Sequence, residues 1–150
     1  MEIELRVANQ SDLPDLIALD AECFPPGNSD LEPAPQGEIE AGVEEGNIFA
    51  AAVNQKVVGM LQLEKVSSNE WELLTLAITS GHRGQAIGKA LMERLFVELS
   101  QSPYLVAVSC LTSPNNEAMQ GLLESFGFVQ VGLIPDYFGP GKHRLKFQLN

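Results

Sequence analysis

The stretch TSGHRGQAIGKALM, residues 79–92, decides how the rest of the sequence is interpreted. It joins an apolar segment to an amphipathic helix in which Ile87, Leu91 and Leu95 are spaced by four residues. A strand that turns directly into a helix leaves backbone N–H groups unpaired, and the helix dipole and Arg83 add positive charge there. The turn therefore predicts a phosphate site. The alternative is a plain strand–helix connection whose N–H groups serve only the helix.

Two common phosphate-binding patterns do not fit this turn. The P-loop pattern GxxxxGK[ST] fails because three residues, not four, separate Gly84 from Gly88, and because Ala90 replaces the hydroxyl that would hold Mg²⁺. The GxGxxG fingerprint also fails, and it should close a first βαβ unit rather than follow a series of strands. A nucleotide held in either of these ways is therefore not expected.

Around the turn, the sequence predicts one mixed α+β domain over residues 1–150. Alternating and continuous apolar runs indicate strands over 1–8, 47–53, 56–66, 69–79, 104–111, 127–134 and 143–149. The 3.6-residue period indicates helices over 9–24, 37–45, from the turn to about 101, and 113–126. We expect Ser11 or Asp12 to cap the first helix. We expect Ser113 or Asn115 to cap the last one.

The composition limits the partners of the protein. Nine Lys and Arg residues stand against 20 Asp and Glu residues, which gives a net charge of −11. This charge argues against a nucleic-acid surface. It is compatible with a cationic partner or with a solvated acidic surface that keeps the protein soluble. The oligomeric state is left open, a homodimer included.

Neither a membrane nor a metal is expected. No apolar run approaches 18 residues and no signal peptide opens the chain, so the sequence predicts a soluble cytoplasmic protein. Cys23 and Cys110 lie in or beside apolar runs, which is typical of buried thiols. His82 and His143 have no ligand-like spacing, and we expect both at exposed loop or strand-end positions.

Three motifs, in order along the chain, resemble those of the GNAT acetyltransferase superfamily. RGQAIGKAL resembles the signature Q/R-x-x-G-x-G/A, which holds the pyrophosphate of acetyl-CoA. LLTLAITSGHRG resembles the family's fourth strand and donor loop, and NEAMQGLLESFGF resembles the second donor motif, N-x-x-A-x-x-L-Y-E-x-x-G-F. IELRVANQSDLPDLIALDAECFP and VVGMLQLE are similar to its opening strand and helix and to its third strand. The resemblance covers nearly the whole chain.

This resemblance implies a central, mostly antiparallel mixed sheet flanked by helices, with the fourth and fifth strands splayed. It implies acetyl-CoA as co-substrate, and direct transfer in a ternary complex to the primary amine of a small molecule or a peptide. The implied coenzyme contacts lie on the fourth strand, the turn and the second donor motif: Leu76, Ala77, Ile78, Arg83, Gly84, Gln85, Ala86, Ile87, Gly88, Lys89 and Asn116.

The sequence departs from the family pattern at three positions. Ala86 stands where the first signature glycine is expected, and Ser80 replaces the usual proline. Leu123 occupies the place of the tyrosine that protonates the departing thiolate. Ala86 and Leu123 suggest the alternative function, an acyl-CoA-binding module with little or no catalysis.

Glu72 is the candidate general base. A lysine-type amine with a pKa of ~10.4 is almost wholly protonated at pH 7, so a base matters for such an acceptor. Glu72 lies six residues before Ile78, where the histone-lysine branch of the family carries its glutamate base. Alternation along the strand would place it on the face of Leu74, Leu76 and Ile78, where burial raises its pKa. The alternative is a strand-end carboxylate that faces solvent. Glu70 is a weaker candidate.

Tyr137 is the second catalytic candidate. With Phe138, it lies where the amino-terminal acetyltransferase branch places an aromatic pair against its peptide. Its hydroxyl can also substitute for the tyrosine missing at position 123. The alternative is that DYFGPG is a turn whose aromatic residues cover the core.

Overall fold

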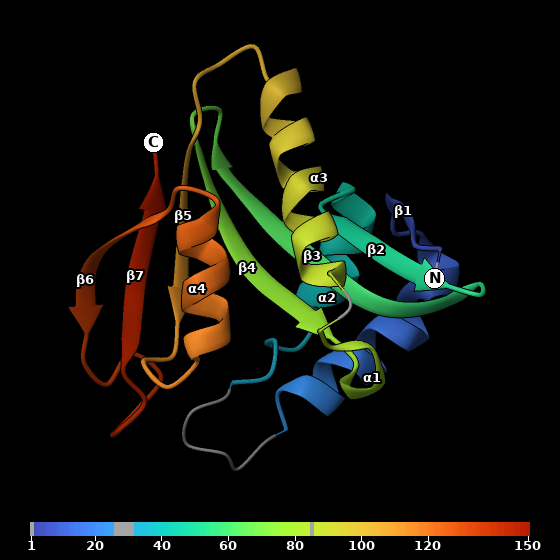
Figure 1. The fold of residues 1–150 in the computed structure, drawn as a ribbon, viewed down its shortest axis with the longest axis horizontal. Helices are drawn as coiled ribbons and strands as arrows, with labels where there is room; N and C mark the ends of the chain where they lie inside the picture. Colours follow the sequence, from blue (N-terminus) through green and yellow to red (C-terminus); the bar gives the residue numbers. More distant parts are fainter. Residues whose placement is uncertain (1, 26–31, 85) are drawn as a thin grey trace.

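The described residues of the computed structural model, 2–25, 32–84 and 86–150, form one sheet of seven strands (Figure 1). The strand order is β1–β2–β3–β4–β5–β7–β6; β4 and β5 run parallel, and the other neighbours in this sheet run antiparallel. The strands are β1 (Glu4–Val7), β2 (Ile48–Val53), β3 (Lys56–Ser67), β4 (Glu70–Ile78), β5 (Ala107–Thr112), β6 (Val129–Ile134) and β7 (Arg144–Leu149).

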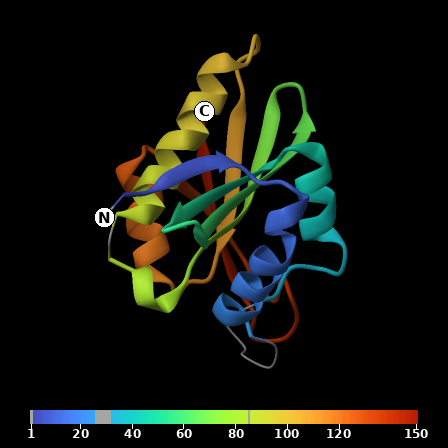
Figure 2. The same ribbon diagram turned by 90° about the vertical axis from the view of Figure 1, so that its right-hand side faces the viewer.

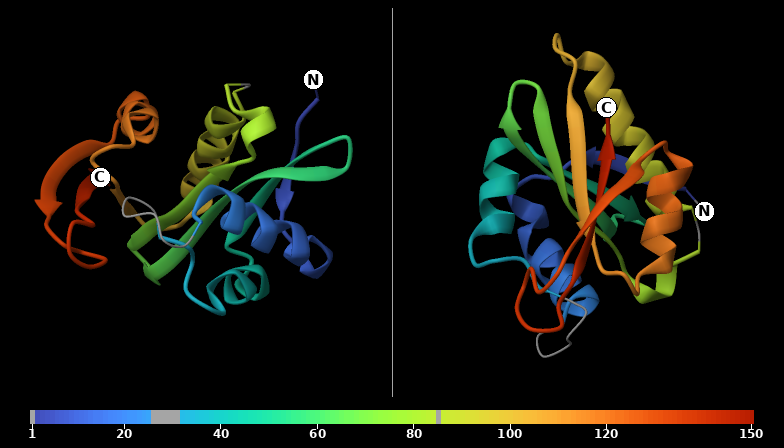
Figure 3. Two further views of the ribbon diagram at one scale, coloured as in Figure 1. Left: turned by 90° about the horizontal axis from the view of Figure 1, so that it is seen from below. Right: turned by 90° about the vertical axis from the view of Figure 1, so that its left-hand side faces the viewer.

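The α-helices of the described residues lie on both faces of the sheet. They are α1 (Leu13–Cys23), α2 (Glu38–Glu45), α3 (Ile87–Gln101) and α4 (Glu117–Ser125). α1 and α2 lie on one face and α3 and α4 on the other (Figures 2 and 3). Leu16 and Ile39 belong to the core on the first face, and Leu91 and Leu123 to the core on the second. The predicted α+β sheet flanked by helices is confirmed. None of these helices is long and apolar enough to cross a membrane.

The predicted order of elements is confirmed, but the cap of the first helix is not. Asn9 caps a short 3₁₀ turn, Gln10–Asp12, that precedes α1; its Oδ1 accepts a hydrogen bond from the Ser11 amide at 3.0 Å. The Asp12 carboxylate accepts from the Asn9 amide at 3.0 Å and from Arg6 at 2.7 Å instead of capping α1. Asp12 does stand at the N-cap position of α1, but neither its side chain nor that of Ser11 caps the helix, because the Asp12 carboxylate is used in a reciprocal capping box one turn earlier.

Two boundaries also differ in the second half of the chain. The strand predicted from residue 104 begins at Ala107, and Leu105 is 95% exposed. The cap of α4 is Asn116, whose side chain accepts from the amide three residues further on at 3.0 Å. The predicted caps, Ser113 and Asn115, lie before the helix and hydrogen-bond to each other. Asparagine is as good a cap as serine, so the sequence alone did not separate these positions.

A β-bulge at Leu74 divides β4 into two parts. Gln62 of β3 pairs with Thr75, and the next residue, Leu63, pairs with Leu73. Leu74 is therefore the extra residue that has no direct partner on β3.

The bulge reverses which residues of β4 face each pair of helices. Before it, Trp71 and Leu73 belong to the core under α3 and α4; after it, Leu76 and Ile78 pack against that same core. Glu72 therefore lies on the opposite face, on the side of α1 and α2. The prediction that Glu72 shares a face with Leu76 and Ile78 is wrong, because alternation does not continue through a bulge.

The parallel strands β4 and β5 separate after Leu73. Their pairing runs from Glu70 to Leu73, and within the described residues β4 has no β5 partner over 74–78. Strand β5 continues to Thr112, paired with β7 on its other side. The left view of Figure 3 shows β6 and β7 set apart from β3 and β4. The predicted splay of the fourth and fifth strands is confirmed.

Candidate functional site

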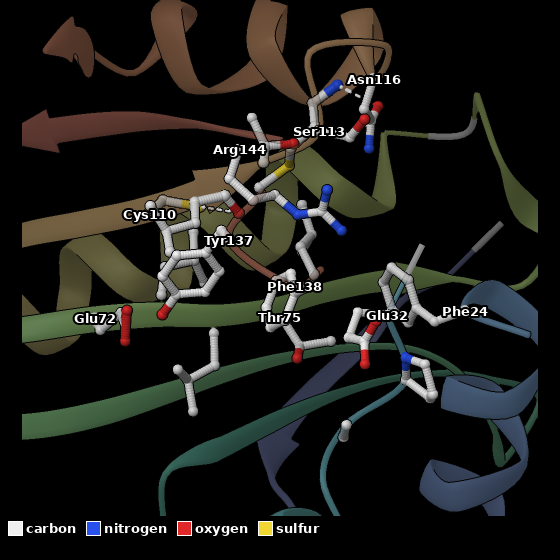
Figure 4. A pocket seen from close by; sticks show the side chains of 18 of the residues that line it. Phe24, Glu32, Glu72, Thr75, Cys110, Ser113, Asn116, Tyr137, Phe138 and Arg144 are labelled. Atoms are coloured by element: carbon white, nitrogen blue, oxygen red, sulfur yellow. Dashed lines mark hydrogen bonds between the residues drawn. The ribbon is translucent and has the colours of Figure 1, made fainter. Parts of the chain in front are cut away.

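The splay of β4 and β5 opens into a cleft of about 590 Å³ (Figure 4). Its walls come from the segment after α1, the first turn of α2, β3 and β4, the end of β5 with the start of α4, and the residues around the start of β7. The bulged part of β4 forms one edge. Alternate N–H and C=O groups of this part point away from β3 and toward the cleft, since an antiparallel partner uses only every second pair.

Of the three coenzyme contacts implied on β4, only one lines the cleft. Leu76 lines the cleft, together with Leu74 and Thr75. Ala77 is buried in the core under α1 and α2. The carbonyl of Ile78 accepts hydrogen bonds from other parts of the protein, so it is not free for a ligand.

The turn between β4 and α3 presents main-chain donors at an exposed place. Gly84 has a φ of +79°, and a Cβ built on it would meet nothing within 4 Å. Ala86, the residue before α3, has a φ of +65° and makes no side-chain cap. Helix α3 therefore begins with unpaired N–H groups, and the positive end of its dipole is at the same place. This arrangement fits a pyrophosphate. Gln85 lies outside the described residues.

The remaining predicted turn residues take different places. Ile87 is buried in the core, so only its N–H can contribute. A Cβ on Gly88 would lie 3.4 Å from Leu122 Cδ2, an ordinary van der Waals contact, so a methyl group would fit at this position. Lys89 is exposed. Asn116 lines the cleft, but its Oδ1 already accepts from the α4 amide that it caps.

Arg83 does not extend from the turn as a free cation. Its Nε donates to the Ile78 carbonyl at 3.0 Å, and its Nη2 lies 3.5 Å from Cys23 Sγ. The guanidinium is therefore turned toward the end of β4 and the end of α1. Of the two cysteines, Cys110 is buried as predicted and Cys23 is half-buried.

Three carboxylates gather at the end of the cleft where β4 and β5 are still paired. Glu72 and Glu64 are direct cross-strand partners, and Glu38 reaches the same wall from α2. Burial, then the charge of Glu64, raises the pKa of Glu72; Lys146 opposes the shift. Burial, then Glu64, raises the pKa of Glu38. The expected direction for Glu72 is confirmed, although its neighbours are acids and not the leucines predicted.

Gln62 fixes the position of Glu38. Its Nε2 donates to the Glu38 carbonyl at 3.0 Å, and its side chain is 3% exposed. A Cβ on Gly42 would overlap the Gln62 amide group, so the helix approaches β3 this closely only because residue 42 is glycine. The first turn of α2 is thereby held against the sheet beside the cleft.

Tyr137 and Phe138 line the opposite wall. Their rings pack edge to face with centroids 4.6 Å apart, and both side chains are partly exposed in the cleft. Arg144, which is 5% exposed, lies 4.8 Å above the Phe138 ring. In Figure 4, the Tyr137 hydroxyl is directed to the side of the cleft where Glu72 lies.

His82, His143 and Leu123 do not line the cleft. His82 ends a short 3₁₀ turn and is half-buried, so the prediction that it is exposed is wrong. His143 is exposed and its Nδ1 accepts from the Asp136 amide at 3.0 Å, which shapes the turn before β7. Leu123 is fully buried in the core and does not line the cleft. The described residues contain no group of His, Cys, Asp and Glu that could hold a metal.

The sequence did not single out Glu38, Glu64 or Arg144. Glu38 was part of an ordinary acidic helix, and Glu64 and Arg144 occupied polar positions of alternating strands. These residues come together only through the pairing of β3 with β4 and the placement of α2 and β7 around the splay. No local pattern in the sequence could have shown this.

Known proteins share both the sequence pattern and the fold. The model of the acetyltransferase (GNAT) family matches residues 13–128. Ard1 from Thermoplasma volcanium superposes with a TM-score of 0.85 at 18% identity, over 99% of this chain and 97% of that chain. Arabidopsis thaliana Naa50, in complex with the bisubstrate analogue CoA-Ac-MVNAL, gives 0.85 at 20% identity, over 100% and 99%. The ribosomal-protein-S18-alanine N-acetyltransferase from Escherichia coli gives 0.82 at 19% identity, over 99% and 93%.

At such identities the structural likeness is one of fold alone. No curated protein matches the sequence at a significant level.

Proposed function

The chain belongs to the acetyltransferase (GNAT) family, and on that premise we propose that it moves an acetyl group from acetyl-CoA to a primary amine, by direct transfer in a ternary complex. The observation that carries the proposal is the open edge of β4, which lies between the main-chain donors at the start of α3 and the carboxylate of Glu72. Both reactants can meet there without leaving the cleft.

The coenzyme is assigned to the turn and the open edge. The first N–H groups of α3, near Ala86 and Gly88, bind the pyrophosphate through the main chain. The extended arm of acetyl-CoA then lies along residues 74–78 of β4, where free N–H groups polarise the thioester carbonyl. Gly84 leaves open space for the approach of the ligand.

The reaction then needs a neutral amine and a departing thiolate. The amine nitrogen attacks the thioester carbon, a C–N bond forms, and the C–S bond breaks as the coenzyme leaves with the electron pair on sulfur. Glu72 takes the amine proton, directly or through one water molecule, and its raised pKa suits this role. Tyr137 or water gives a proton to the thiolate, which with an ordinary thiol pKa of ~8.5 needs only modest help.

The acceptor is proposed to be a peptide or a small molecule that carries a cationic amine. The carboxylates of Glu38, Glu64 and Glu72 attract such an amine, and the Tyr137 ring provides a face for it. The names of two structural relatives support a peptide: one is bound to the analogue CoA-Ac-MVNAL, and the other acts on an alanine of a ribosomal protein.

The test is a transfer assay with acetyl-CoA against peptides with a free α-amine, peptides with only a lysine amine, and polyamines. Thiol release is followed together with the mass of the acceptor. We expect one class to gain an acetyl group in step with thiol release. Binding of acetyl-CoA by calorimetry without transfer to any amine would instead support the acyl-CoA-binding module. If the protein does not bind acetyl-CoA, both the acetyltransferase and the acyl-CoA-binding proposals are wrong.

A further inference from the structure

The end of α1 makes a set of hydrogen bonds to the turn that joins β4 and α3. The carboxylate of Glu22 accepts from the Ser80 amide at 2.8 Å and from the Thr79 hydroxyl at 3.0 and 3.1 Å. The Ser80 amide, then the Thr79 hydroxyl, lowers the pKa of Glu22 below its ordinary value. Glu22 is therefore an ionised side chain tied to the turn.

A second group of bonds acts on the last residue of β4. The Ile78 carbonyl accepts from Arg83 Nε at 3.0 Å and from Cys23 Sγ at 3.3 Å, and Arg83 Nη2 lies within reach of the same sulfur. The two groups of bonds hold both ends of the segment 78–83 to α1. We call these contacts of Glu22, Cys23 and Arg83 the α1 brace.

Charge alone predicts that the brace weakens the affinity for the coenzyme. A carboxylate beside a phosphate site repels the ligand, so Glu22 should weaken coenzyme binding. Arg83 is the only cation of the brace. Two of its N–H groups already donate to Ile78 and Cys23, so fewer donors remain to bind a phosphate. Ser80 and Gly84 are exposed, and ordering such a turn on binding costs conformational entropy. A brace that orders the turn beforehand removes part of this cost.

We infer that Glu22 and Arg83 are positioning residues for the coenzyme: they hold residues 78–83 of the turn in their binding shape and do not act mainly through their charge on the phosphates. This inference rests on the proposed coenzyme site. It proposes a positioning role for Arg83 in place of the expected direct phosphate contact, and it assigns a role to Glu22, which lies outside the family's donor motifs as they match this chain.

Glu22 provides the sharper test, because the two explanations predict opposite signs. We would measure the affinity of the full chain for acetyl-CoA by calorimetry in the wild type and in the Glu22→Ala and Glu22→Gln variants. The brace predicts that Glu22→Ala weakens binding about five- to tenfold, the size of one ordinary hydrogen bond. Glu22→Gln keeps an acceptor for the Ser80 amide and should stay within about twofold. Tighter binding in both variants would overturn the inference and leave a purely electrostatic role.

Arg83 gives a second, independent measurement. Lysine keeps the positive charge but lacks the planar group that reaches the Ile78 carbonyl and Cys23 together. We therefore expect Arg83→Lys and Arg83→Gln to lose similar affinity. Wild-type affinity in Arg83→Lys, with a loss only in Arg83→Gln, would show a direct charge contact and overturn the positioning role.

Two controls separate this inference from the proposed function. Glu44→Ala removes one negative charge from an exposed position of α2 and should leave affinity unchanged. Thermal unfolding of each variant shows whether an affinity loss reflects a loss of fold. If the wild type binds no acetyl-CoA, the proposed function fails; if it binds and the Glu22 variants bind more tightly, only the brace fails.

Discussion

The two halves of the cleft are built from different parts of the polypeptide. The proposed coenzyme half consists of the β4 edge, the turn and the first amides of α3, all within residues 74–89, and it relies on main-chain groups. The acceptor half consists of side chains from α2, β3, β4, the loop before β7 and β7 itself: Glu38, Glu64, Glu72, Tyr137 and Arg144. A main-chain site depends on the path of one segment and needs small residues. A side-chain site depends on how distant segments pack.

This difference predicts that each half can be damaged alone. The largest effect is expected for Gly88→Glu, which places bulk and a negative charge among the first amides of α3. We expect at least a 10²-fold loss of acetyl-CoA affinity by calorimetry, since charge repulsion adds to the lost main-chain contact. Gly88→Ala is the matched control, because its Cβ would contact the flexible end of Leu122 at 3.4 Å. Unchanged affinity in Gly88→Glu would remove the coenzyme from this turn.

Glu72→Gln should damage the acceptor half alone. Glutamine keeps the shape of the side chain but cannot take a proton, so turnover should fall by ~10²-fold while acetyl-CoA affinity is nearly unchanged. The deficit should shrink as pH rises, because more of the amine is then neutral. Glu70→Gln, two residues earlier on the strand, is expected to behave as wild type. Wild-type turnover of Glu72→Gln from pH 6 to 9 would show that Glu72 is not the base.

Leu123→Tyr tests a position that belongs to neither half. Because Leu123 is fully buried, a larger ring overpacks the core and should cost about 1–3 kcal/mol of unfolding free energy, with no gain in turnover. Urea unfolding and the transfer assay measure the two quantities. Glu124→Tyr, on the exposed side of α4, should change stability little. A stable Leu123→Tyr enzyme with faster turnover would place residue 123 in the cleft.

The smallest effect is expected on thermal stability, because the charge of the partly buried Glu72 destabilises the folded protein. The pKa of Glu72 is raised in the folded protein, so its contribution to stability is present below its unfolded pKa and is lost as pH rises through the folded value. Glu72→Gln should therefore melt with the wild type near pH 4 and about 2 °C higher near pH 8. The measurement is a series of thermal melts. A difference that does not change with pH would contradict the burial of the charge.

The sequence was informative where main-chain geometry leaves a residue pattern. Gly84, Gly88 and Asn116 stand in motifs, and the structure places them at the turn, at the start of α3 and beside the cleft. The direction of a side chain leaves no such pattern. The sequence around Arg83 does not show whether its side chain points to a phosphate or to the Ile78 carbonyl. In the structure the guanidinium also contacts Cys23, which lies 60 residues away along the chain.

The error on β4 and the burial of Leu123 in α4 have a similar cause. In LLTL, residues 73–76, leucines stand directly before Leu74 and two residues after it, so nothing marks Leu74 as the extra residue; the register is set by pairing with Gln62 and Leu63. Leu123 lies in a helix whose motif matches the family, but burial at that position follows from how α4 packs against the sheet. The local sequence pattern predicted that these elements exist. Which of their side chains are buried depends on packing between elements that are distant in the sequence.

The bulge at Leu74 makes the length of the chain as important to this site as its composition. The bulge shifts the alternation of side chains between the two faces of the sheet by one residue. Deletion of one codon there would make the alternation continuous along β4. Either Glu72 would then turn into the apolar core, or Leu76 and Ile78 would leave it. We expect this deletion to be more damaging than any substitution of Leu74. A one-codon deletion in the exposed connection at Leu105 should instead be tolerated.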